Sequence, residues 1–127
     1  MDSRREFSTV AQPPSLPFQS TSGVLETFVV SRLRHRQATG VQEAAELLGV
    51  HRSTLARSLH EEGTSWRYLL DRSRFVLARE YLTDTGAELK DIAHALGYTE
   101  TSSFIRAFQR LAGMSPGKFR QKQKESS

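Results

Sequence analysis

The chain contains no cysteine, which excludes a disulfide, a thiol nucleophile and a cysteine-based zinc cage. It also lacks any apolar run that approaches the roughly 18 residues of a membrane span. No charged segment followed by an apolar one opens the chain, as it would in a signal peptide. We therefore expect a cytoplasmic protein without a membrane partner.

Motifs of common catalytic sites are missing as well. There is no Gly-rich phosphate loop, no GxSxG and no HExxH. None of the histidines forms a metal-ligand pair at i and i+4 with a neighbouring carboxylate; they are His35, His51, His60 and His94. We expect neither catalysis nor a bound metal or cofactor.

Lysine is scarce, although the chain is basic. The formal net charge is +4 and the pI is about 9.9. Arginine supplies most of the positive charge, and its planar fork matches phosphates and the edge of guanine. This composition favours an anionic partner. A genome rich in G and C favours arginine codons too, so composition alone leaves both explanations open.

Strand-like alternation of apolar and polar residues is absent, and the organisation predicted is all-α with about seven helices. Residues 1–22 are rich in Ser, Thr, Pro and Gln, which predicts a disordered tail or interdomain linker. Residues 23–124 are predicted to form one domain. Its parts are a first unit at about 24–63, a connecting helix at about 64–83 and a second unit at about 85–124.

Cap patterns mark the starts of two short helices. The stretch TGVQ at 39–42 places Thr at the N-cap and Gln at N3 of a capping box. The stretch TGAE at 85–88 repeats the pattern with Thr and Glu. Each helix would end before a glycine, Gly49 or Gly97, because a glycine inside a helix costs about 1 kcal/mol relative to alanine.

The two units share a sequence pattern. AELLGV at 45–50 resembles AHALGY at 93–98. Further on, Leu55, Arg57 and Leu59 correspond to Phe104, Arg106 and Phe108, with one residue inserted in the second copy, and Gly63 then corresponds to Gly113. A match of this length indicates duplicated structural units.

Each copy has the layout of a helix-turn-helix. A small alanine lets the first helix cross closely over the second, glycine forms the turn, and Val50 or Tyr98 is expected to plug the core. The outer face of the second helix is then free to enter a major groove. Helical hairpins with this pattern also occur without DNA binding. An interaction module that retains the fold is therefore the alternative hypothesis.

The segment IAHALGYTETSSFIRAFQRLAGMSPGKFR closely resembles the signature of the AraC/XylS family of bacterial transcription regulators. The matching residues are Ile92, Ala93, Leu96, Gly97, Tyr98, Ser103, Phe104, Arg106, Ala107, Phe108, Gly113, Ser115, Pro116, Phe119 and Arg120. The resemblance extends back to about Val24. It implies double-stranded DNA as partner, with two recognition helices in successive major grooves about 34 Å apart.

The resemblance also implies roles for individual residues. The base-reading positions are Ser53, Ala56 and Arg57 in the first unit and Ser102, Ser103 and Arg106 in the second. The expected phosphate contacts are His51, Arg52, Thr54, Lys90 and Thr101. Arg57 and Arg106 can each fork onto guanine O6 and N7. As an alternative, Arg57 pairs with Glu61 at i+4 on the surface, whereas Arg106 has a like charge, Arg110, at i+4.

Most members of this family carry a sensing or dimerising domain ahead of the DNA-binding module. The Pro- and Ser-rich start of this chain resembles the linker that would follow such a domain. We therefore expect the C-terminal part of a larger regulator that also contacts RNA polymerase. A stand-alone member is the alternative.

Overall fold

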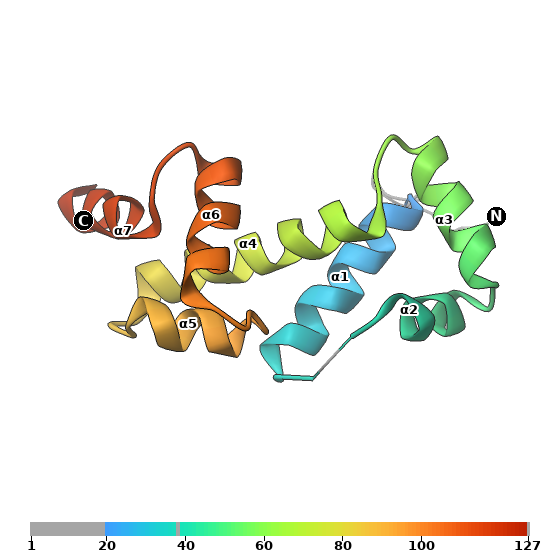
Figure 1. Ribbon diagram of the computed structural model, residues 1–127, viewed down its shortest axis with the longest axis horizontal. Coiled ribbons are helices and arrows are strands. Elements are labelled where there is room, and N and C mark those ends of the chain that lie inside the picture. Colours follow the sequence, from blue (N-terminus) through green and yellow to red (C-terminus); the bar gives the residue numbers. More distant parts are fainter. Residues whose placement is uncertain (1–19, 38, 127) are drawn as a thin grey trace, which may run out of the picture.

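The computed structural model describes residues 20–37 and 39–126, and these residues form seven α-helices and no strand (Figure 1). The prediction of an all-α fold is confirmed. The helices are α1 (Thr21–Arg34), α2 (Val41–Leu48), α3 (Arg52–Glu61), α4 (Trp66–Asp84), α5 (Leu89–Ala95), α6 (Thr101–Ala112) and α7 (Pro116–Ser126). No helix among the described residues is both long and apolar enough to cross a membrane.

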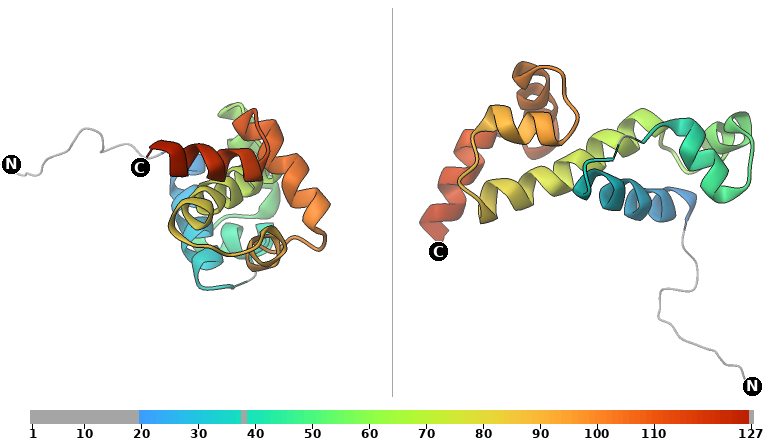
Figure 2. Two further views of the ribbon diagram at one scale, coloured as in Figure 1. Left: turned by 90° about the vertical axis from the view of Figure 1, so that its left-hand side faces the viewer. Right: turned by 90° about the horizontal axis from the view of Figure 1, so that it is seen from below.

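Helix α4 is the axis of the molecule. It has 19 residues, and its bounds are close to those predicted for the connecting helix, about 64–83. Helices α2 and α3 lie at one end of it, and α5, α6 and α7 at the other (Figure 1). Helix α1 packs along α4 (Figure 2), where the two Nη atoms of Arg34 donate to the carboxylate of Glu80 at 2.8 and 3.2 Å.

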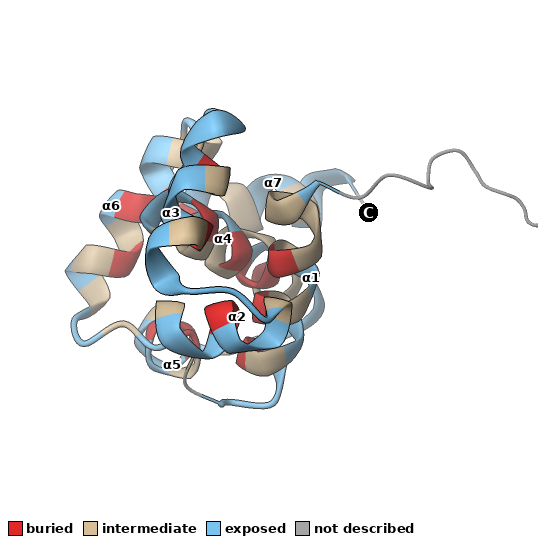
Figure 3. Ribbon diagram, turned by 90° about the vertical axis from the view of Figure 1, so that its right-hand side faces the viewer, coloured by how far each residue is buried: buried red, intermediate tan, exposed pale blue. Residues whose placement is uncertain are grey.

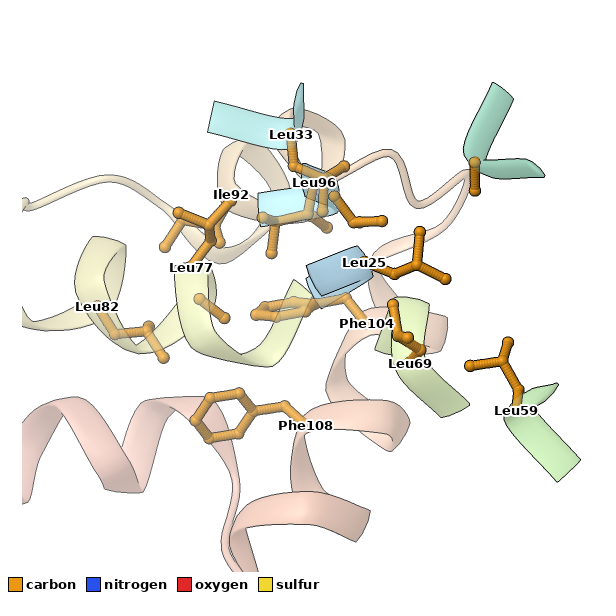
Figure 4. Close-up of a cluster of buried hydrophobic side chains, with 14 of the residues drawn as sticks. Leu25, Leu33, Leu59, Leu69, Leu77, Leu82, Ile92, Leu96, Phe104 and Phe108 are labelled. Atoms are coloured by element: carbon orange, nitrogen blue, oxygen red, sulfur yellow. The ribbon is translucent and has the colours of Figure 1, made fainter. Parts of the chain in front are cut away.

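The apolar core follows α4 along its length. Figure 4 shows a row of side chains that includes Leu59, in the first unit, Leu82, near the end of α4, and Phe108, in the second unit. The core residues predicted for the second helix of each unit are buried, since Leu55, Leu59, Phe104 and Phe108 are all at most 2% exposed. Because the row is continuous, burial of apolar surface holds both units to the same helix.

The two turns have the same geometry, as the internal repeat predicts. Gly49 and Gly97 have φ angles of +69° and +91°, a left-handed conformation that favours glycine. The amide of the next residue then donates back across the turn, Val50 to the Ala45 carbonyl at 3.0 Å and Tyr98 to the Ala93 carbonyl at 2.9 Å.

The residue after each glycine behaves differently in the two units. Tyr98 is half-buried and packs on Phe104, with ring centroids 5.7 Å apart. Val50 is 37% exposed, so the prediction that it plugs the core is wrong. The core of the first unit is completed by Leu55 and Leu59 instead.

Both predicted capping boxes are wrong in detail. Helix α2 has Gly40 at its N-cap, and the carboxylate of Glu43 accepts from the Gly40 amide at 3.0 Å. Helix α5 begins after Glu88. The Thr85 hydroxyl instead donates to the Tyr81 carbonyl at 2.6 Å and accepts from the Ala87 amide at 3.2 Å.

The start of α1 lies earlier than the predicted start of the domain at residue 23. The Ser20 hydroxyl caps the helix by accepting from the Gly23 amide at 3.1 Å. The Glu62 carboxylate, at the end of α3, accepts from the amides of Thr21 and Ser22 at 2.9 and 3.0 Å. These hydrogen bonds hold residues 20–23, so that α1 begins within the predicted tail. Residues 1–19 of that tail lie outside the described part of the chain.

Candidate nucleic-acid interface

Helices α3 and α6 are the second helices of the two units, and they lie on one side of the molecule. They are at opposite ends of α4 (Figure 1). The view along the long axis in Figure 3 places both of them on one side of α4, and α1 and α7 on the other. The fold therefore presents both predicted recognition helices on one side.

The outer face of α3 carries the base-reading residues predicted for the first unit. Ser53, Ala56 and Arg57 are spaced i, i+3 and i+4, and all three are exposed. Arg57 has no hydrogen-bond or ion-pair partner among the described residues, so its predicted alternative, a pair with Glu61, is not formed. Its guanidinium is available to an external ligand.

The start of α3 brings two predicted roles together. His51 is the N-cap, and its Nδ1 accepts from the Ser53 amide at 3.3 Å and lies 3.0 Å from the Ser53 hydroxyl. With Nδ1 as acceptor, a neutral ring carries its proton on Nε2, which is then a donor. Of the other residues expected here to contact phosphates, Arg52 is exposed and Thr54 half-buried.

Helix α6 presents the base-reading residues predicted for the second unit. Ser102 and Arg106 are exposed, and Ser103 and Thr101 are half-buried. Arg106 is 3.5 Å from the Ser103 hydroxyl, at the outer limit for a hydrogen bond. The Arg106 guanidinium is therefore fixed at the surface only by this one weak interaction within the described residues.

Lys90 lies apart from these residues, on α5. Its ammonium is 3.8 Å from the Glu88 carboxylate, and both side chains are 72% exposed. An ion pair so exposed contributes little to stability, and it leaves the ammonium accessible to a phosphate.

A polar hollow of about 460 Å³ lies between α4 and α6, beside the turn that precedes α6. Arginine dominates its lining, and Asp71 is the one acidic residue there; the polar residues are Arg67, Asp71, Arg74, Thr99, Ser103, Arg106 and Arg110. Arg67 was not among the residues predicted for this surface, because it lies on a different helix from Arg106 and the spacing along one helix does not relate the two.

Asp71 pairs with two of these arginines. Its carboxylate is 3.2 Å from Nη2 of Arg110, on α6, and 3.9 Å from Nη1 of Arg74, on α4. Arg110 thus has an acidic partner in addition to its like-charged neighbour Arg106. Sequence spacing along α6 identified only the like charge.

Arg74 connects α4 to the turn of the second unit. Its Nε donates to the Leu96 carbonyl at 3.0 Å, and its guanidinium lies 4.5 Å from the centroid of the Tyr98 ring. Burial raises the pKa of the Tyr98 hydroxyl above its ordinary value, against the opposing effect of the Arg74 charge. Asp71 and Arg74, which lie within one helical turn of each other on α4, therefore hold in place the loop at Gly97 and the recognition helix α6.

Comparison with known proteins identifies the same domain. The family model described as a helix-turn-helix domain matches residues 44–122, more than half of the chain. An uncharacterized HTH-type transcriptional regulator of Mycobacterium tuberculosis is 40% identical over 77 residues, which are 61% of this chain and 22% of that protein. The HTH-type transcriptional regulator VirS of the same species is 30% identical over 119 residues, or 94% of this chain and 35% of VirS. The chain thus spans about a third or less of these relatives.

Solved structures share the fold. A DNA-binding transcriptional dual regulator from Escherichia coli K-12 superposes with a TM-score of 0.78 at 24% identity, over 87% of this chain and 97% of that one. A transcriptional regulator with an AraC-type DNA-binding domain from Chromobacterium violaceum gives 0.68 at 23% identity, over 83% and 96%. At these identities the likeness establishes the fold alone. Together with the matched family model and the signature at residues 92–120, it shows that the chain belongs to the AraC/XylS family of helix-turn-helix transcription regulators.

Proposed function

We propose that this chain binds double-stranded DNA in a sequence-specific way, with α3 and α6 in successive major grooves on one face of the duplex. The observation that carries the proposal is that α3 and α6 lie on one side of α4, each with an exposed arginine. At 1.5 Å per residue, α4 is about 28 Å long. With the width of the units at its ends, that length matches a groove separation of about 34 Å.

The exposed arginines are the proposed base readers. Arg57 and Arg106 are each assigned a guanine, where a bidentate contact is worth about 1–3 kcal/mol of discrimination. Ser53, Ser102 and Ser103 add hydroxyls, and Ala56 offers a methyl group suited to thymine. The first unit has less polar side-chain surface at its base-reading positions, so it contributes less to sequence discrimination than the second.

Phosphate contacts would fix the register of the domain on the duplex without specifying sequence. We assign this role to His51, Arg52, Thr54, Lys90 and Thr101, which are all exposed or half-buried. The Nε2–H of His51 and the positive end of α3 lie at the same helix start, and both favour an anion.

The proposal for the rest of the regulator rests on the lengths of the relatives. Because this chain spans 22% and 35% of its relatives' lengths, we propose that an effector-binding or dimerising domain accompanies it. Transcription would be controlled by contact between the bound domain and RNA polymerase. This activity belongs in the cytoplasm, where bacterial DNA is located.

The test is selection of binding sites from a randomised duplex pool, followed by sequencing. We expect two short conserved blocks one helical turn apart. Arg57→Ala should erase a guanine from one block and Arg106→Ala from the other, so each variant is the control for the other. If Arg106→Ala weakens specific and non-specific binding equally, Arg106 is a phosphate contact and its assignment as a base reader is wrong.

The salt dependence of the affinity for DNA distinguishes the two hypotheses, a DNA-binding domain and a protein-interaction module. Neutralising about six phosphates should give a slope of about −5 for log affinity against log salt concentration. A slope near zero, with no enrichment at low salt, would favour a module that retains the fold without binding DNA.

A further inference from the structure

We infer that Asp71 is a specificity-determining residue of the second unit. It holds Arg110 against α4, so that α6 offers Arg106 to the DNA without a second free cation from the same helix. This inference rests on the proposed function, because it assigns a role within the same DNA interface. The inference is drawn from the observation that Asp71, Arg106 and Arg110 line the same hollow between α4 and α6.

The geometry of Asp71 is that of a fixed anchor. Its side chain is only 15% exposed, and its Oδ2 is 3.2 Å from Nη2 of Arg110. Its other oxygen faces Arg74, whose Nε is itself fixed by the Leu96 carbonyl. A carboxylate removed from water to this extent is stabilised by two neighbouring cations. Arg110, whose side chain is 62% exposed, is the solvent-facing partner of the pair.

Arg110 lies one helical turn beyond Arg106 on α6, and both line the hollow. Free of Asp71, its long side chain would be able to reach a phosphate near the Arg106 contact. Such a contact adds affinity for every sequence, whereas the base contact of Arg106 adds affinity for one sequence. A contact made with every duplex multiplies both affinities by the same factor, so it steepens the salt slope without changing their ratio. Tethering Arg110 raises the ratio of specific to non-specific binding by keeping Arg110 from drawing α6 out of the position in which Arg106 reaches its base.

The anchor also sets the rotation of α6 about α4. The bond between Asp71 and Arg110 joins residues 39 positions apart in the chain, and it lies on the same side of α6 as Arg106. Loss of the bond would let Arg106 sample directions away from its base. Asp71 thus acts on affinity for every sequence through the charge of Arg110, and on discrimination through the position of α6.

The decisive experiment compares Asp71→Asn with Asp84→Asn in the full chain. Affinities are measured for the selected site and for an unrelated duplex over a range of salt concentrations. Asp84 is the matched control: it is exposed at the end of the same helix and has no partner in the described part of the chain. Both variants remove one negative charge.

We expect Asp71→Asn to lower the ratio of specific to non-specific affinity by about 3- to 10-fold. Its salt slope on the unrelated duplex should steepen by about 0.9, the value for one added phosphate contact. Asp84→Asn should leave the ratio within about twofold of wild type. If the two variants change the ratio equally, the effect is one of net charge and the inference is overturned.

A second variant tests the tether without disturbing the nearly buried carboxylate. Arg110→Gln changes an exposed side chain, and we expect it to leave the salt slope of the wild-type domain unchanged. A slope shallower by about 0.9 would mean that Arg110 already contacts a phosphate, which contradicts the inference. In the double variant of Asp71→Asn and Arg110→Gln, the slope on the unrelated duplex should return to the wild-type value.

The wild-type measurement distinguishes two kinds of failure. A wild-type domain that does not discriminate between the selected site and the unrelated duplex refutes the proposed function, and this inference with it. A wild-type domain that discriminates, with Asp71→Asn no different from Asp84→Asn, refutes this inference alone.

Discussion

In the first helix-turn-helix unit the residue after the turn glycine is Val50, which is 37% exposed, and the second helix is held by aliphatic leucines. In the second unit the corresponding residue is Tyr98, which packs on Phe104. The ring of Phe108 then contacts Phe104 at 6.0 Å and two further rings, those of Phe75 on α4 and Phe119 on α7. The same backbone geometry is thus packed with aliphatic side chains at one end of α4 and with contacting aromatic rings at the other.

The polar ties of the two recognition helices also differ. The second, α6, is tied to the connecting helix through Asp71 and Arg110. The first, α3, is tied to the start of α1, because Glu62 at its end accepts from the Thr21 and Ser22 amides. The orientation of α6 therefore depends on α4, which both units share. The orientation of α3 depends partly on α1, which follows directly from the preceding part of the chain.

The largest expected effect comes from breaking the aromatic cluster with Phe108→Ala. Phe108 is 2% exposed and contacts three rings, so its loss leaves a cavity between three helices. We expect the free energy of unfolding to fall by about 3–5 kcal/mol, measured by urea denaturation followed by circular dichroism. The control is Leu59→Ala in the first unit, for which the range is about 2–5 kcal/mol. A smaller loss for Phe108→Ala than for Leu59→Ala would contradict the contrast between the two cores.

A smaller effect, confined to the second unit, is expected from Arg74→Ala. The change removes a charged donor to the Leu96 carbonyl and the cation over Tyr98. A hydrogen bond to a charged group is worth about 1.5–3 kcal/mol, and the Arg74 side chain is 20% exposed, so we expect a loss of about 2 kcal/mol. Hydrogen exchange should accelerate for amides of α5 and the turn at 97–99, but not for those of α2.

Arg72→Ala is the control for this prediction. Arg72 lies on the same helix, is exposed, and makes no hydrogen bond or ion pair within the described ranges. Its removal should change stability by less than about 0.5 kcal/mol. If Arg74→Ala accelerates exchange equally in α2 and α5, Arg74 stabilises the whole domain and not the second unit in particular.

Much of this arrangement was predictable because local sequence patterns carry it. The apolar spacing of Leu55 and Leu59, and of Phe104 and Phe108, fixes which face of each helix is buried. The same spacing leaves Arg57 and Arg106 on the outside, as predicted. The exposure of these arginines is confirmed, and their contacts with DNA bases remain a prediction.

The errors arose where two local interactions compete. The Thr85 hydroxyl was expected to cap the next helix, but in the structure it donates to the Tyr81 carbonyl of α4 and accepts from the Ala87 amide, which precedes α5. At 39–42 the longer Glu43 side chain reaches back to Gly40, one position later than the predicted box. Local sequence shows that a cap is present, but not which neighbour it serves.

Contacts between distant residues could not be predicted at all. Glu62 and the start of α1 are about 40 positions apart in the chain, and Asp71 and Arg110 are 39 apart. The spacing of residues along one helix does not indicate which residue of another helix each of them contacts. These two long-range ties are nevertheless what distinguishes the support of α3 from that of α6.

The smallest expected effect tests the tie of the first unit through its pH dependence. Partial burial pushes the pKa of Glu62 up, but the hydrogen bonds from Ser22 and Thr21 outweigh it and leave the pKa below its ordinary value. A carboxylate with a lowered pKa stabilises the folded state above the pKa of the unfolded chain, about 4.3. The contribution is lost as pH falls through the lower pKa of the folded state.

Glu62→Gln should therefore lower the melting temperature at pH 7 and have progressively less effect below about pH 4. A carboxylate at a helix N-terminus is worth about 0.3–1 kcal/mol, which corresponds to at most about 4–8 °C for a domain of this size. Glu61→Gln is the matched control, since Glu61 is the adjacent exposed acid and has no partner among the residues described. A pH-independent difference between Glu62→Gln and wild type would show that the side chain acts by packing. In that case α3 would lack the charged tie to α1 that sets it apart from α6.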